Sequence, residues 1–143
     1  MKKIFLLFPV FVFAFLLTGC TEEYYLDYNE MTHMIKRVSI VEVQRNEYYG
    51  EISIEQIKEL NETDLAVFLG ELTELKYEYS VFLEPENNTG LSIMLTYDSP
   101  DYDYVIIGKN GIEKFKDNKE LSFFNARCDE NEFLKIVNRY LND

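Results

Sequence analysis

The side chains best suited to nucleophilic or metal chemistry are few in this chain. Its 143 residues include two cysteines, Cys20 and Cys128, and a single histidine, His33. A serine or cysteine nucleophile needs a base that a third group holds rigidly, and His33 stands in or beside a charged segment without a regular period. We therefore expect His33 to be a solvated surface residue. A zinc site fails by the same count, and we predict no catalytic residue, no metal ligand and no cofactor.

Cys128 admits two interpretations. It stands just before a predicted C-terminal helix, whose positive end could lower the pKa of the thiol. However, no lysine or histidine stands beside it in the sequence, and no second cysteine is available to resolve an oxidised form. We favour a small residue that packs against the rest of the domain.

An acidic cluster surrounds Pro100 and consists of Asp98, Asp101 and Asp103. Oxygen-rich loops bind calcium, but Tyr102 and Val105 occupy positions where a helix–loop–helix calcium site has polar residues. We favour a solvated turn. The sequence also contains no glycine-rich phosphate loop and no carboxylate pair whose positions indicate acid–base work, and we predict a protein that is not an enzyme.

The first nineteen residues have the make-up of a secretory signal peptide. Lys2 and Lys3 precede an apolar run over residues 4–17 that is broken only by Pro9. This run is shorter than the roughly 20 apolar residues that span a bilayer. We interpret residues 1–19 as a leader that is removed.

The end of this leader carries a more specific motif. Leu17-Thr18-Gly19-Cys20 resembles the lipobox of bacterial lipoprotein precursors. The resemblance implies cleavage between Gly19 and Cys20 and a thioether-linked diacylglycerol on Cys20. We therefore expect the lipid on Cys20 to attach the protein to the cell membrane, on its extracytoplasmic face.

The charge of the remaining chain restricts its partners. Two of the 14 lysines and arginines and none of the 26 acidic residues lie in the leader, so its removal changes the formal charge from −12 to −14. Nucleic-acid binding needs a basic face and is disfavoured. An anionic membrane surface should also repel this chain, so the lipid must hold it. With Cys128 as the remaining thiol, no internal disulfide can form.

Residues 20–33 contain the lipidated N-terminus and a charged segment without clean periodicity. We predict a flexible tether, which at full extension lifts the domain about 40 Å from its anchor. An alternative is that Tyr24, Tyr25 and Tyr28 lie at the bilayer interface, where aromatic rings are favoured.

Residues 34–143 are predicted to form a single α+β domain. Helical spacing and capping residues indicate helices over 61–75 and 129–141, with Asn61 and Asp129 as N-caps. Alternation and turn residues indicate strands over 38–43, from Ile52, and over 77–83, 91–97, 102–107, 112–116 and 121–125. We predict an antiparallel sheet of about six or seven short strands, with the two amphipathic helices packed on one face and the other face partly open.

In overall character the chain resembles the small uncharacterised lipoproteins of low-GC Gram-positive bacteria. The shared features are an early strand rich in Val and Ile, a short helix, Tyr-rich strands such as Leu95-Thr96-Tyr97, and a closing amphipathic helix. The resemblance implies a position on the outer face of the cytoplasmic membrane and assigns no functional residue.

Three functions fit these observations. The first is a non-catalytic binding module for an envelope protein or another envelope component. Tyrosines on the open sheet face would be its anchors, because Tyr is enriched at binding hot spots; the candidates are Tyr77, Tyr79, Tyr97, Tyr102 and Tyr104. We expect Tyr102 and Tyr104 to share one face, with Val105 and Ile107 on the other.

The second candidate function is an immunity, exclusion or inhibitor lipoprotein against a basic hydrolase, toxin or phage. The third is a small enzyme or ligand carrier with a pocket between sheet and helices.

Overall fold

The computed structural model describes residues 21–46 and 48–142. Within these residues the chain has the predicted α+β architecture, with eight strands and three helices. In chain order they are β1 Glu22–Tyr25, α2 Tyr28–Thr32, β2 Ile35–Arg45, β3 Ile52–Glu59, α3 Glu62–Glu74, β4 Lys76–Tyr79, β5 Gly90–Tyr97, β6 Tyr104–Gly108, β7 Gly111–Lys116, β8 Lys119–Asn125 and α4 Glu130–Leu141. None of the helices described has the length and hydropathy needed to cross a bilayer. The predicted leader, Gly19 and Cys20 lie outside the described residues.

The strands form two antiparallel sheets. The main sheet has six strands in the order β3-β2-β5-β6-β7-β8, and β1 pairs with β4 in a separate ribbon. Tight turns join the neighbours at the β8 end. Asp117 and Asn118, for example, both have positive φ angles, of 50° and 59°, as two-residue hairpin turns require. The predicted turn chemistry at this position is confirmed.

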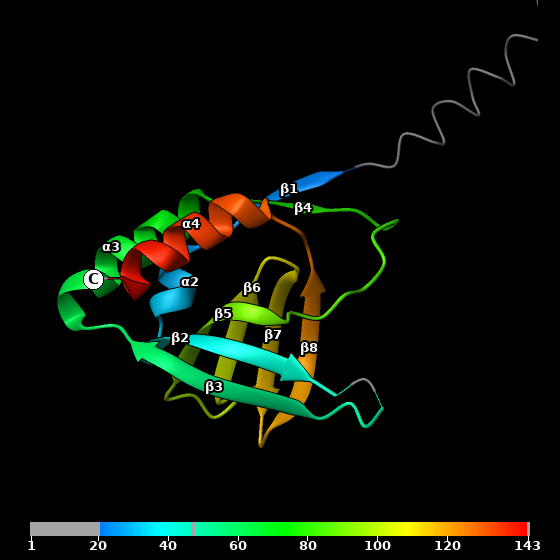
Figure 1. Ribbon diagram of the computed structural model, residues 1–143, viewed down its shortest axis with the longest axis horizontal. Helices are drawn as coiled ribbons and strands as arrows, with labels where there is room; N and C mark the ends of the chain where they lie inside the picture. Colours follow the sequence, from blue (N-terminus) through cyan, green and yellow to red (C-terminus); the bar gives the residue numbers. More distant parts are fainter. Residues whose placement is uncertain (1–20, 47, 143) are drawn as a thin grey trace, which may run out of the picture.

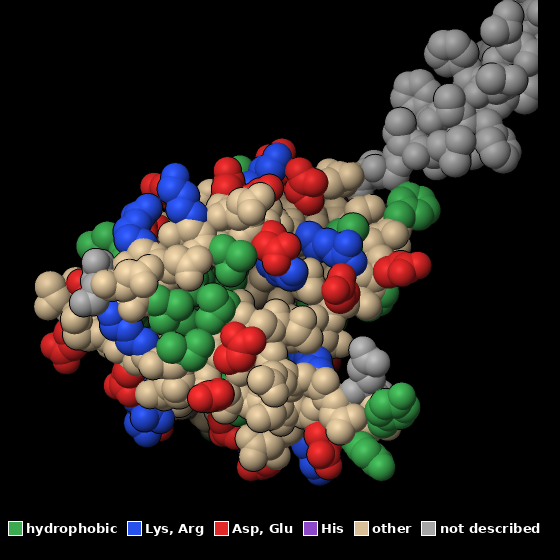
Figure 2. Space-filling view, in the orientation of Figure 1, with side chains coloured by type: hydrophobic (Ala, Val, Ile, Leu, Met, Phe, Trp, Pro, Cys, Tyr) green, Lys and Arg blue, Asp and Glu red, His purple; other side chains and the backbone are tan. Residues whose placement is uncertain are grey.

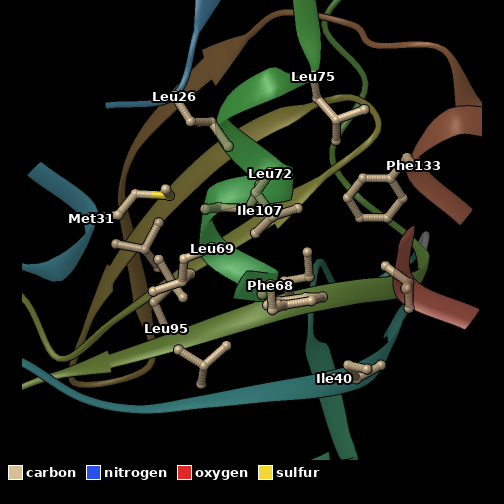
Figure 3. Close-up of a cluster of buried hydrophobic side chains, with 14 of the residues drawn as sticks. Leu26, Met31, Ile40, Phe68, Leu69, Leu72, Leu75, Leu95, Ile107 and Phe133 are labelled. Atoms are coloured by element: carbon tan, nitrogen blue, oxygen red, sulfur yellow. The ribbon is translucent and has the colours of Figure 1, made fainter. Parts of the chain in front are cut away.

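The helices pack on one face of the main sheet (Figure 1). Asn61 and Asp129 cap α3 and α4 through side-chain oxygens that accept hydrogen bonds from Asp64 N and Glu132 N, each at 2.9 Å. Each helix buries the stripe that its spacing predicts: Phe68, Leu69 and Leu72 in α3, and Phe133, Val137 and Tyr140 in α4. Together with β2, β5 and β6, these stripes form the main hydrophobic core (Figure 3).

The predicted flexible tether is wrong for residues 22–32, which belong to the folded domain. Strand β1 pairs with β4, and helix α2 follows directly after Asp27, which caps it. Leu26 and Met31 are only 5% and 6% exposed, and their side chains point into the same cluster as the α3 leucines (Figure 3). The physical reason is that burial of these two apolar side chains, with the β1–β4 hydrogen bonds, offsets the entropy cost of ordering the segment.

The second face of the sheet is partly covered. A smaller apolar cluster of Val41, Val43, Ile106 and Phe115 is buried there. Asn87 and Asn88 lie against this face through hydrogen bonds to Glu113, and Asn88 is buried against Gly108, where an added Cβ would lie 2.2 Å from Asn88 Oδ1. The absence of a side chain at Gly108 thus allows the connection between β4 and β5 to cover this part of the sheet.

Candidate functional site

A pocket lies between the N-terminal segment and the helix-side face of the main sheet. Its cavity volume is about 180 Å³, somewhat larger than an apolar cavity of about 150 Å³ that holds a benzene molecule. The pocket is lined by Tyr24, Leu26, Asp27, Glu30, Met31, Leu95, Tyr97, Tyr102, Val105, Ile107, Ile112, Lys114, Ser122 and Phe124. A wall of this pocket is therefore built by the segment that the sequence pattern assigned to a tether.

Two aromatic pairs flank the pocket. Tyr24 meets Phe124 edge-on with ring centroids 5.0 Å apart, and Tyr97 meets Tyr102 in the same way at 5.0 Å. The Tyr97 hydroxyl donates a hydrogen bond to the Met31 carbonyl oxygen at 2.8 Å, which ties helix α2 to strand β5. Burial raises the pKa of Tyr97 well above its usual range, and the phenol stays neutral. The pocket thus has aromatic walls, and the Tyr97 phenol among them is uncharged.

Charged groups stand at the pocket mouth. Asp27 and Glu30 are exposed residues that line it from the N-terminal segment, while Lys114 lines it from β7 with its Nζ 5.3 Å from the centre of the Tyr102 ring. Burial, followed by the nearby carboxylates of Glu30 and Asp27, raises the pKa of Tyr24. Two carboxylates face one ammonium group at this mouth, so it favours a ligand with a cationic rather than an anionic head.

The tyrosines predicted as exposed anchors are distributed differently in the structure. Tyr77 and Tyr97 are buried in the main core, so this prediction is wrong for them. Tyr102 precedes β6 and packs with Tyr97, whereas Tyr104 stacks on Phe115 at 4.9 Å on the opposite face. The expected shared face of Tyr102 and Tyr104 is therefore also wrong, because the chain becomes a regular strand only from Tyr104. Tyr79 is half-buried against Phe124.

The remaining candidate residues are not brought together. His33 is an exposed residue at the C-cap of α2. Cys128 is half-buried beside the Tyr77 hydroxyl, and burial raises the pKa of its thiol to about 11, which matches the packing interpretation. The Asp103 carboxylate accepts a hydrogen bond from Asp117 N at 2.7 Å, and Asp98 and Asp101 lie in the turn before it. In the described part of the chain, no group of three His, Cys, Asp or Glu residues is placed to hold a metal ion.

A buried polar network on the second face was not anticipated from the sequence. The Glu113 carboxylate is fully buried and forms an ion pair with Arg45. It also accepts hydrogen bonds from Asn87 Nδ2 at 2.6 Å, and from Asn88 N and Nδ2 at 3.2 and 3.0 Å. The sequence signal for this network was the alternation of β7, which puts Glu113 on the same face as the apolar Phe115 and so indicates a buried carboxylate. The network connects β2, β7 and the β4–β5 connection.

Comparison with known proteins assigns no relative to this chain: no family model, no curated protein and no solved structure matches it.

Proposed function

We propose that this protein is a non-catalytic binding module, held by a lipid on Cys20 at the extracytoplasmic face of the cell membrane. Its ligand would be an apolar group about the size of one ring, carried by a small molecule or by an envelope protein. The pocket between the N-terminal segment and the sheet is the observation that supports this proposal. It combines apolar walls with a few convergent polar groups, the usual make-up of ligand sites.

The anchor and the pocket are adjacent in the chain. Tyr24 lines the pocket and is separated from Cys20 by three residues. A ligand in the pocket would therefore be held close to the bilayer surface, because an extended chain covers only about 3.3–3.6 Å per residue. This proximity supports a role at the membrane and disfavours a role that needs a long reach from it.

The binding proposal is tested with three ring compounds of similar size and different charge. Phenethylamine, benzyl alcohol and 3-phenylpropionate are titrated into the protein that begins at Thr21, and binding is followed by NMR chemical-shift changes. We expect the amine to bind most tightly, because Asp27 and Glu30 outnumber Lys114 at the mouth. Failure of all three compounds to perturb the pocket residues would contradict the proposal.

Two adjacent positions on β8 supply matched variants. Ser122 lines the pocket, whereas Leu121 is exposed and is not among the lining residues. We expect Ser122→Trp to block binding and Leu121→Trp to leave it unchanged. Equal binding by both variants would place the ligand elsewhere.

A second candidate is an immunity, exclusion or inhibitor lipoprotein directed against a basic hydrolase, toxin or phage component. Its support is the formal charge of −14 from Cys20 onward, which would accelerate association with a basic partner. Deletion of the gene should then increase sensitivity of the cells to lytic enzymes or phage, and unchanged sensitivity would count against this candidate.

A further inference from the structure

The turn that follows β4 exposes two apolar side chains. Val81 and Phe82 are 72% and 69% exposed, although this chain buries most of its large apolar residues. Figure 1 shows this turn at the same end of the molecule as the start of β1, and Figure 2 shows an apolar projection beside the first described residues. Two strongly exposed apolar side chains therefore lie next to the point where the chain enters the domain at Thr21.

The register of the β1–β4 ribbon explains this proximity. Glu22 pairs with Tyr79 in the antiparallel ladder, so Thr21 and Ser80 are the next residues at the same end. Cys20 is bonded directly to Thr21, and consecutive Cα atoms are about 3.8 Å apart. Val81 and Phe82 come directly after Ser80. The predicted lipid attachment and the apolar turn thus emerge at one end of one ribbon.

Hydrogen bonds to the rest of the domain also fix the position of this turn. Leu83 N donates to Ser80 O at 3.0 Å and closes the turn. The Leu83 carbonyl accepts a hydrogen bond from Asn125 Nδ2 at 3.2 Å, and the Glu84 carbonyl accepts one from Arg127 Nη2 at 3.0 Å. The two apolar side chains are therefore presented on a fixed support, which lowers the entropy cost of inserting them into another phase.

We propose that Val81 and Phe82 insert into the outer leaflet of the bilayer that holds the lipid on Cys20, at the level of the glycerol and the first acyl carbons. This inference rests on the proposed lipid anchor. The anchor supplies most of the membrane affinity, because acyl chains bury far more apolar surface than two side chains. The turn supplies a second, fixed contact, and two contacts at one end of the ribbon define how the domain is oriented on the membrane.

The β2–β3 connection offers the internal comparison. Tyr48 there is 92% exposed, and Figure 1 places this connection at a different corner of the domain from the start of β1. If exposure alone determined membrane contact, Tyr48 would insert as readily as Phe82. On our proposal, the turn after β4 contacts the membrane because the register of the ribbon places it beside the lipid attachment.

The chain contains no tryptophan, so one introduced indole reports on one position. The lipidated protein that begins at Cys20 is prepared as Phe82→Trp and as Tyr48→Trp, and each is reconstituted on phosphatidylcholine vesicles with or without brominated acyl chains. Flotation with the vesicles is measured first. We expect a shift to shorter emission wavelength and loss of fluorescence on brominated vesicles for Phe82→Trp, and neither change for Tyr48→Trp.

The outcomes separate the anchor from the turn. A protein that fails to float with the vesicles overturns the lipid anchor and this inference with it. A protein that floats while the Phe82→Trp emission remains that of an indole in water overturns the membrane contact and leaves the anchor intact. Equal loss of fluorescence at both positions also overturns the inference, because the turn would then not define the orientation.

Discussion

At the scale of single residues, the polar groups of this protein act mainly in packing. The thiol of Cys128 lies beside the Tyr77 hydroxyl in the core rather than at a reactive surface. Glu113 is a fully buried carboxylate whose oxygens meet one guanidinium and several amide donors. A thiol and a carboxylate can both take part in catalysis, but in this fold these two groups contact side chains of other elements.

Cys128 should react slowly with thiol reagents in the native protein. Burial raises the pKa of this thiol to about 11, so about one molecule in a thousand carries the reactive thiolate at pH 8. We expect labelling by a chromogenic disulfide to be about 100-fold slower, or slower still, than in the same protein unfolded in guanidinium chloride, where the thiol has its ordinary pKa. Native and unfolded chains that label at similar rates would contradict the packing interpretation.

Glu113 should be among the residues most sensitive to substitution. Glu113→Ala leaves Arg45 and Asn88 without their buried partner, and removal of one member of a buried ion pair costs about 3–5 kcal/mol. We expect a loss of this size in urea unfolding. Glu120→Ala is the matched control, because Glu120 accepts a hydrogen bond from the same Asn87 side chain while exposed to solvent, and its effect should stay within about 0.5 kcal/mol. Equal effects of the two variants would show that the buried network does not stabilise the fold.

At the scale of elements, the N-terminal segment is the part whose role changes most between sequence and structure. Strand β1 and helix α2 are too short to be stable alone, since isolated helices shorter than about 12–15 residues are marginal in water. They are ordered through tertiary contacts: the ladder with β4, the Tyr97–Met31 hydrogen bond, and the burial of Leu26. The same contacts form one wall of the pocket.

The Leu26→Ala variant tests whether the N-terminal segment is part of the folded domain or a flexible tether. Because Leu26 is buried in the main core, its truncation should lower the free energy of unfolding by about 2–5 kcal/mol. Tyr28→Ala, in the adjacent helix α2 but with an exposed side chain, should cost much less. If Leu26→Ala left the free energy of unfolding in urea unchanged, the interpretation of this segment as a flexible tether would be supported instead.

At the scale of the whole molecule, the acidic charge and the proposed lipid on Cys20 would act in opposite directions at a membrane. The acidic chain is repelled by anionic headgroups, while the acyl chains on Cys20 would hold it by burial of apolar surface, at about 0.8 kcal/mol for each methylene group. Figure 2 shows acidic groups over much of the visible face, with basic groups among them. On the proposed membrane location, the anchor and the turn at residues 80–83 would determine attachment and orientation without help from charge.

The protein that begins at Thr21 should remain unbound when mixed with vesicles of anionic phosphatidylglycerol. Its formal charge of −14 favours repulsion, and repulsion is strongest at low ionic strength, where screening is weakest. The measurement is flotation at low and at moderate salt, with the lipidated protein that begins at Cys20 as the positive control. Flotation of the unlipidated protein at low salt would reveal an attraction that its charge does not provide.

Local patterns determined much of the secondary structure, because a helix stripe, an N-cap or a two-residue hairpin depends on residues a few positions apart. Helices α3 and α4 and the turn at Asp117–Asn118 were predictable for this reason. The lipobox resemblance is equally local, and it remains a prediction about residues outside the described part of the chain.

The pocket, the order of residues 22–32 and the burial of Tyr77 and Tyr97 depended on the tertiary structure. Each is set by contacts between segments far apart in the chain, such as Glu22 with Tyr79 and Tyr97 with Met31. A short segment with mixed polarity has no local signal strong enough to decide whether it is ordered. Only the surface that the rest of the fold presents to it, here β4 and the helix-side face of the sheet, makes its burial favourable.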